Sequence, residues 1–189
     1  NIGGFSNIST RHEGKRIAFD ICPVNIVLNK YVEVLQKKFD EDGNFARNGK
    51  VNEMILKSLN TLPFYKENHP KSLGIEWVNQ HIIPLLENET PENILATFTE
   101  HAADQIAKIF NHYQFKNVLF TGGGTYNSYL IERIKNKSST EIIIPTRELI
   151  DFKEALIFAF MGVLKMNNEI NVLSSATGCS ADHSSGIIV

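Results

Sequence analysis

Three glycines in a row, Gly122, Gly123 and Gly124, follow the apolar run at residues 117–121 and precede a helical pattern that begins near Asn127. The run predicts a short buried strand, and ligands in open α/β sheets bind beyond the carboxyl ends of strands. Glycines at such a corner let a ribose, a base edge or a phosphate approach the backbone N–H groups. A tight turn requires glycine equally well, so both interpretations stay open.

A second glycine pair, Gly3 and Gly4, stands close to Ser6 and Asn7. Short polar side chains beside exposed backbone N–H groups suit contacts with phosphate or sugar oxygens. A β-bulge or the twist of a hairpin explains the same pair of glycines. The pair is therefore a second candidate for binding, with a structural alternative.

Acidic residues stand at two further positions where chemistry is conceivable. Asp20 ends an apolar strand pattern, where a carboxylate can hold Mg²⁺-bound water or a sugar hydroxyl, or can cap the helix that follows Pro23. Asp151 and Glu154 lie three residues apart at the head of the last predicted helix. Taken alone, that position favours interaction with the helix dipole over a binding role.

The elements that must position these residues alternate between strands and helices. Residues 2–9 and 16–21 predict an antiparallel pair, and residues 91–113 predict a long helix with an apolar stripe and Thr90 as its N-cap. Further helices are expected from Pro23 to Phe39, between Gly49 and Leu62, and over residues 75–86, 127–135 and 151–166; further strands are expected over residues 141–144 and 186–189. This alternation implies an α/β layer fold.

The composition excludes several classes of protein. The chain has 189 residues, 42% of them hydrophobic, and a formal net charge of -2, so it can bury a core and lacks the basic excess of a nucleic-acid-binding protein. No apolar run is long enough to cross a bilayer, and we expect a cytoplasmic protein. Cys22 and Cys179 suit neither a disulfide framework nor a zinc site. The six histidines show no metal-ligand spacing and are interpreted as surface or structural residues.

Seven short motifs occur along the chain in an order that is informative as a whole. They are Asn1-Ile2-Gly3-Gly4 with Asn7; Phe19-Asp20 with Pro23 and Asn25; Lys71-Ser72 with Gly74, Glu76 and Trp77; Thr97-Phe98-Thr99-Glu100; Gly122-Gly123-Gly124 with Tyr126 and Asn127; Glu154-Ala155; and Thr177-Gly178. In this order they resemble the characteristic sequence motifs of anhydro-N-acetylmuramic acid kinases. The resemblance spans essentially the whole chain and covers the second half of that family.

The resemblance implies an actin-like ATPase, or ribonuclease H-like, fold in which a central mixed sheet is flanked by helices. Residues 1–189 would form a single lobe, the C-terminal nucleotide-binding half of a two-lobe kinase. The cofactors implied are ATP and Mg²⁺, and the substrate is a sugar. Such enzymes phosphorylate the 6-position of 1,6-anhydro-N-acetylmuramic acid while water opens the anhydro bridge, in cell-wall recycling and amino-sugar catabolism.

The resemblance also assigns roles to individual residues. Gly3, Gly4 and Asn7 resemble the second phosphate segment, Asp20 and Asn25 the following cleft segment, and Gly122, Gly123, Gly124 and Asn127 the adenosine segment; Glu154 resembles a carboxylate that reaches the sugar. Asp20 would hold Mg²⁺ through water. At residues 21, 22 and 24 this chain has Ile, Cys and Val where the family more usually has Thr and two glycines, which weakens the expectation of close phosphate approach there.

The family's first phosphate loop and its water-activating aspartate belong to an N-terminal lobe that has no match in this sequence. The chain also opens without Met, and we expect a fragment that has little or no turnover by itself, because phosphoryl transfer needs the whole cleft. Homodimer formation is a further expectation from the family.

Two other functions remain open at this point. The fold hosts several chemistries, so the parent protein could be another actin-like ATPase of the chaperone type, or another sugar or acetate kinase. A non-catalytic nucleotide-binding module is the second alternative.

Overall fold

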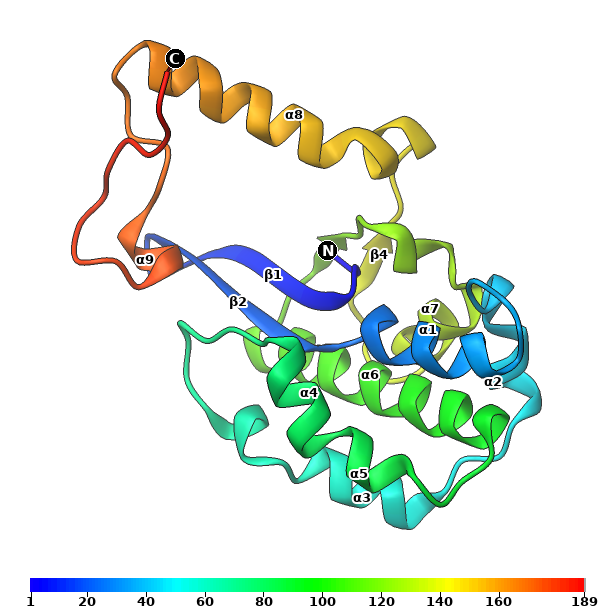
Figure 1. Cartoon of the computed structure of the whole chain (residues 1–189). Helices are drawn as coiled ribbons and strands as arrows, with labels where there is room; N and C mark the ends of the chain where they lie inside the picture. The colour runs from blue at the N-terminus through cyan, green and yellow to red at the C-terminus, as the bar shows by residue number, and fades with distance from the viewer. Residues whose placement is uncertain (189) are drawn as a thin grey trace.

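The computed structural model describes residues 1–188, and helix α6 (Pro91–Tyr113) runs through its centre (Figure 1). Thr90 caps the helix by accepting a hydrogen bond from the Asn93 N–H, and Gln114 ends it in the left-handed conformation. Its apolar side chains recur at helical spacing, and all of them are at least 98% buried: Ile94, Phe98, Ala102, Ile106 and Phe110. The predicted long helix is confirmed with the same bounds.

The chain begins with a β-hairpin formed by β1 (Phe5–His12) and β2 (Lys15–Pro23). The two strands are antiparallel and are joined by a tight turn in which Glu13 and Gly14 both have positive φ, the conformation typical of a type I′ turn. The register shifts between Ser6 and Asn7, which marks a bulge. The predicted antiparallel pair is confirmed.

A second strand pair consists of β3 (Asn117–Leu119) and β4 (Glu141–Ile143), which run parallel and are connected through η3 (Gly123–Tyr126) and helix α7 (Ser128–Lys135). The α/β class is confirmed. Within residues 1–188, however, the strands form two separate two-stranded sheets instead of one central mixed sheet. Leu119 is 50% exposed, so β3 is not the buried strand that its apolar sequence predicts.

Short helices lie around α6 (Figure 1). They are α1 (Asn25–Val34), α2 (Asn44–Asn48), α3 (Glu53–Asn60), α4 (Ile75–His81) and α5 (Ile83–Leu86), with the 3₁₀ turns η1 (Glu41–Gly43) and η2 (Pro63–Lys66). Helix α1 ends at Val34, five residues before the predicted end at Phe39. The single helix expected over residues 75–86 is broken at Ile82, because Pro84 lacks the N–H that would continue it.

Helix α8 (Arg147–Met166) stands apart from this helical layer, and the short helix α9 (Ser174–Thr177) follows it (Figure 1). Only Ile150 of α8 is buried, although the helix is rich in large apolar residues. Helix α8 begins four residues before the predicted start at Asp151. Residues 186–188 form no strand, so that prediction is wrong for them, and Val189 lies outside the described residues. In the described part of the chain, no helix has both the length and the apolarity to span a membrane.

Candidate nucleotide site

The two glycine segments, which are about 120 residues apart in the sequence, meet at one corner of the molecule. The Ile2 N–H donates a hydrogen bond to the Thr121 carbonyl oxygen at 2.6 Å, and the Gly124 N–H donates to the Ile2 carbonyl oxygen at 2.8 Å. These two bonds fix the start of the hairpin against the end of β3. The sequence predicted two separate glycine segments near a ligand, and the structure brings them together.

The glycines at this corner differ in what the fold requires of them. Gly122 has a φ of 88°, and a Cβ there would lie 2.6 Å from the Ile2 carbonyl oxygen; a Cβ on the buried Gly124 would collide with the Ile2 side chain. The turn itself therefore explains both residues. Gly123 is exposed, and a Cβ there would meet no atom within 4 Å. The packing does not require glycine at this position, and the binding interpretation stays open for Gly123.

A polar hollow of about 280 Å³ lies at this corner. Backbone from the two glycine segments forms one wall, and the second and third turns of α8 form the other. Its lining residues are Asn1, Gly3, Gly122, Gly123, Ile150, Asp151, Lys153 and Glu154. Because α8 begins at Arg147, Asp151 and Glu154 lie beyond the first helical turn, and the helix-dipole interpretation of these two carboxylates is wrong.

Lys153 is the residue of this hollow that the sequence analysis missed. Its Nζ donates hydrogen bonds to Asn1 Oδ1 at 2.6 Å and to Thr121 Oγ1 at 3.0 Å. Burial lowers the pKa of Lys153, against the opposing effect of the Glu154 carboxylate. In the sequence, the only local sign of a binding role for Lys153 was its position between two carboxylates on a helix. The contact that places Lys153 at the hollow is with Asn1, which is 152 residues away in the sequence.

A second, more open hollow of about 440 Å³ borders the same corner, and Gly3 lines both. Gly4 and Asn25 line it together with Lys30 on the exposed side of α1. The Asn25 N–H donates to the Gly3 carbonyl oxygen at 3.3 Å, so the start of α1 is held against the glycine pair. Three of the predicted residues, Gly3, Gly4 and Asn25, are therefore neighbours.

Two predicted asparagines have structural partners. Asn127 caps α7, because its Oδ1 accepts a hydrogen bond from the Leu130 N–H at 2.9 Å, and its side chain is largely buried. The Asn7 N–H donates to the Asn1 carbonyl oxygen at 3.0 Å. Their assignment to adenosine and phosphate contacts stays a prediction.

Asp20 faces a loop and not the start of α1. Its Oδ2 accepts a hydrogen bond from the Leu73 N–H at 2.7 Å, and its own N–H donates to the Lys71 carbonyl oxygen. Helix α1 begins after Val24 without a side-chain cap, so the capping interpretation of Asp20 is wrong. Its role toward Mg²⁺ stays a prediction.

Among residues 1–188, no group of three acidic, histidine or cysteine side chains is arranged to hold a metal ion. Mg²⁺ is usually bound through one or two carboxylates together with substrate phosphates, so the predicted Mg²⁺ site does not require such a group and stays a prediction. The acidic side chains at the polar hollow, Asp151 and Glu154, are exposed, and one of them is already engaged: Asp151 Oδ1 accepts a hydrogen bond from the Tyr126 hydroxyl at 2.9 Å.

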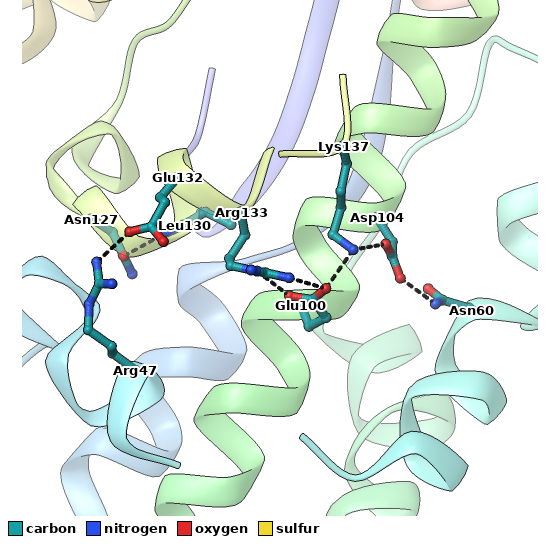
Figure 2. Close-up of polar contacts among 9 residues, drawn as sticks. All are labelled: Arg47, Asn60, Glu100, Asp104, Asn127, Leu130, Glu132, Arg133 and Lys137. Carbon is teal, nitrogen blue, oxygen red and sulfur yellow. Dashed lines mark hydrogen bonds and ion pairs between the residues drawn. The ribbon is translucent and has the colours of Figure 1, made fainter. Parts of the chain in front are cut away.

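The glycine corner is held in place by ion pairs between α6 and the chain that follows the corner (Figure 2). Arg133 donates from Nε and from a terminal guanidinium nitrogen to the two carboxylate oxygens of Glu100, at 2.7 and 2.9 Å. Lys137 Nζ lies 2.5 Å from Glu100 and 2.7 Å from Asp104. The bidentate pair and the bridging lysine fix α7, and with it the turn that precedes it.

Comparison with known proteins agrees with this architecture. Residues 1–189 match the family model described as "Anhydro-N-acetylmuramic acid kinase". Proteins of that name from Francisella tularensis subsp. novicida and Haemophilus influenzae are 33% and 32% identical to the chain, over 96% and 100% of its length. The aligned regions cover 52% and 55% of those relatives, so the chain spans about half the length of the curated relatives it matches.

Among solved structures, the activator of the 2-hydroxyisocaproyl-CoA dehydratase from Clostridium difficile with bound ADPNP is similar to the chain, with a TM-score of 0.53. The match covers 88% of this chain and 60% of that one at 19% sequence identity, which supports a shared fold. The chain has the actin-like ATPase fold and belongs to the anhydro-N-acetylmuramic acid kinase family.

Proposed function

We propose that the whole protein is an ATP-dependent kinase that converts 1,6-anhydro-N-acetylmuramic acid to N-acetylmuramic acid 6-phosphate, and that this chain is its C-terminal, nucleotide-binding lobe. The observation that carries the proposal is the meeting of both glycine segments at a polar hollow lined by Lys153 and Glu154. Family membership supports the substrate. The fold shared with a protein solved with bound ADPNP supports the nucleotide.

The residues of the corner suit a polyphosphate. Gly3 and Gly123 expose backbone at the hollow without a side chain, and Lys153 is the cationic side chain among its lining residues. Glu154 is exposed beside them, and in this proposal its carboxylate accepts a hydrogen bond from a sugar hydroxyl. ATP supplies the transferable phosphoryl group, and Mg²⁺ neutralises charge on its phosphates.

The chain supplies one wall of the cleft in this proposal. Phosphoryl transfer depends on holding both reactants in line, and a single lobe cannot orient the sugar against the phosphate. We therefore expect the isolated chain to bind nucleotide and to show little or no turnover. The N-terminal lobe completes the site, and we place the enzyme in the cytoplasm as a homodimer.

The test is the kinase activity of the full-length protein with ATP, Mg²⁺ and 1,6-anhydro-N-acetylmuramic acid, beside glucose-type sugars, acetate and a control without sugar. Formation of the 6-phosphate with the anhydro-sugar alone supports the proposal. ATP hydrolysis that is independent of sugar would favour a chaperone-type ATPase. Nucleotide binding without turnover on any acceptor would favour a non-catalytic module.

The isolated chain provides a second arm of the experiment. A calorimetric titration with ATP in the presence of Mg²⁺ should show binding to the wild-type chain. Phosphorylation of the anhydro-sugar by this chain alone would contradict the assignment of essential catalytic groups to the other lobe.

A further inference from the structure

A hollow of about 660 Å³ lies near the tip of the β-hairpin, and we call it the tip hollow. Three elements line it: the hairpin, the segment between residues 65 and 71, and the last two turns of α6. Strand β1 leads from the glycine pair to His12 at this hollow, and its eight residues span roughly 23 Å. In the described part of the chain, no residue of the tip hollow also lines either hollow at the glycine corner. The tip hollow is therefore a separate place on the molecule.

Aromatic rings form the floor of the tip hollow. Phe19 is buried, and its ring centroid lies 6.2 Å from that of Tyr113 on α6. The Tyr65 ring also lines the hollow, but its hydroxyl is already engaged, 2.8 Å from Nε2 of His101. Flat apolar groups pack well against such rings. The floor therefore favours an apolar ring on the ligand.

Lysine side chains reach the rim of the tip hollow from two elements. Lys66 and Lys108 are exposed, and neither forms a salt bridge within residues 1–188. Lys71 is engaged, because its Nζ donates to the Phe64 carbonyl oxygen at 2.9 Å. Burial lowers the pKa of Lys71, and the charge of Glu67, the one carboxylate among the described lining residues, opposes this effect. Lys66 and Lys108 are thus the cations that remain for a ligand.

Three of the six histidines line the same hollow. His69 stacks on Phe19 with 5.6 Å between ring centroids, and His12 and His112 pack edge-on against Tyr113 at 5.1 and 4.9 Å. A metal site does not explain them, since residues 1–188 contain no group of three histidine, cysteine or acidic side chains arranged for a metal ion. An imidazole ring has an N–H donor in both its neutral and its protonated form. The three rings therefore suit contacts with an anion.

The helix dipole explains only part of this arrangement. Lys108 and His112 lie in the last two turns of α6, where cations offset the partial negative charge of the helix end. That explanation does not extend to Lys66, His69 and His12, which belong to other elements. A basic composition does not explain them either, because the chain has a formal net charge of -2. The convergence on one hollow is a property of the fold.

We propose that the tip hollow binds a small organic anion, in which an apolar ring rests on Phe19 and Tyr113 and a phosphate or carboxylate contacts Lys66 and Lys108. Its 660 Å³ is within the range of small-molecule sites, which are about 300–1,000 Å³ and combine apolar walls with a few polar groups. Two lysines match the double charge of a phosphate monoester better than the single charge of a carboxylate. This site goes beyond the proposed kinase activity and does not rest on it.

The first experiment is a calorimetric titration of the full-length protein with phenyl phosphate. Inorganic phosphate and phenol each represent one half of this ligand, and benzoate carries a carboxylate in place of the phosphate. We expect phenyl phosphate to bind at least about ten-fold more tightly than either half, because it alone contacts both the floor and the rim. Tighter binding of phenyl phosphate than of benzoate would assign the site to phosphate esters, and the reverse order would assign it to carboxylates.

Paired substitutions locate the binding. The double variant Lys66→Met, Lys108→Met should bind phenyl phosphate at least about ten-fold more weakly. The matched control is Lys57→Met, Lys135→Met, which removes two exposed lysines that do not line the tip hollow and should retain the wild-type affinity. Lys153→Met, at the glycine corner, should also retain it.

Several results would overturn the proposal. No binding of phenyl phosphate at about 1 mM would remove the site. Inorganic phosphate that binds as tightly as phenyl phosphate would indicate an adventitious ion only, and equal losses in the two double variants would indicate general surface charge. A loss in Lys153→Met alone would move the ligand to the glycine corner. Nucleotide and sugar are absent from these titrations, so failure here is distinguishable from failure of the proposed kinase activity.

Discussion

The carbonyl oxygen of Ile2 accepts a hydrogen bond from the Gly124 N–H at 2.8 Å, and this contact joins the two ends of the candidate site. It also explains why adjacent glycines have different roles. The side chain of Ile2 occupies the space that a Cβ on Gly124 would need, whereas a Cβ on Gly123 would meet no atom within 4 Å. The same short motif therefore combines a packing requirement at Gly124 with a position, Gly123, where packing does not require glycine.

Substitutions in the triple glycine should separate these roles. Gly124→Ala should destabilise the fold by about 1–3 kcal/mol, because the added methyl group overpacks a buried site. Gly123→Ala should leave the melting temperature nearly unchanged and weaken nucleotide binding, because its methyl group would project into the hollow. Thermal unfolding and a nucleotide titration of both variants check this, and equal destabilisation by the two substitutions would contradict it.

Lys153→Met should weaken nucleotide binding by about ten- to a hundred-fold, since charge-assisted hydrogen bonds to phosphate contribute on the order of 1.5–3 kcal/mol. The matched control is Lys165→Met on the same helix, whose Nζ contacts the Ser184 carbonyl oxygen and not the hollow. Calorimetric titration at two salt concentrations is the measurement. An unchanged affinity in Lys153→Met, or an equal loss in the control, would remove Lys153 from the proposed site.

Local signals in the sequence were sufficient for the long helix α6 and for the hairpin, and they placed the other helices less accurately. Thr90 and the apolar spacing on α6 gave correct bounds, because a cap and a 3.6-residue period are properties of one segment. The division of the strands into two sheets could not be predicted, because pairing between strands is a long-range contact that no local pattern specifies. Lys153 was missed for a similar reason: the partner that places it at the hollow, Asn1, is 152 residues away.

For the carboxylates, the interpretations that rested on local sequence alone were wrong. Asp20 was expected at a helix cap, at Mg²⁺-bound water or at a sugar hydroxyl. The structure shows that it accepts a hydrogen bond from the Leu73 N–H, which belongs to a loop that sequence spacing does not relate to it. Asp151 and Glu154 were expected at a helix head, but α8 begins earlier, at Arg147. In each case the tertiary position of the carboxylate, and not its local sequence, decided its surroundings.

Glu100→Gln should destabilise the chain by about 1–3 kcal/mol, because it weakens the bidentate bond to Arg133 and the contact with Lys137 in a nearly buried position. Glu132→Gln is the matched control, since its pair with Arg47 is almost half exposed and should contribute little. Urea denaturation of both variants measures the difference. Equal midpoints would show that the link between α6 and α7 does not depend on the buried ion pairs.

Acid should destabilise the fold through His101, whose side chain is fully buried. Burial lowers the pKa of His101 from 6.5 to about 3, and the positive charge of Lys108 contributes a smaller part of this decrease. Asn60 Nδ2 donates a hydrogen bond to Asp104, which fixes Asn60 Oδ1 as the atom that faces His101 Nδ1. Because this oxygen can only accept, the neutral His101 ring donates from Nδ1. Its Nε2 then accepts a hydrogen bond from the Tyr65 hydroxyl. The unfolded chain takes up a proton near pH 6.5 and the folded chain does not, so stability is lost as pH falls from 6.5 toward 3.

Below pH 6, His101 alone should decrease the free energy of unfolding by close to about 1.4 kcal/mol for each unit of falling pH. Urea denaturation between pH 5 and 6.5, where most carboxylates stay ionised, is the measurement. His101→Gln should lower stability at pH 7 and flatten the dependence on pH in this window. An unchanged slope in that variant would show that another group causes the loss.

Two substitutions at Asp20 should separate its loop contact from its predicted role toward Mg²⁺. Asp20→Asn retains an oxygen that can accept the hydrogen bond from the Leu73 N–H, so the chain should keep nearly its full stability. Asp20→Ala removes the acceptor and should cost about 1–2 kcal/mol, because the Leu73 N–H loses its partner. If Asp20 also holds Mg²⁺ through water, the full-length Asp20→Asn enzyme should need a higher Mg²⁺ concentration for half-maximal activity, since a neutral amide attracts the ion less than a carboxylate does. Full activity at the wild-type Mg²⁺ concentration would leave Asp20 with the loop contact alone.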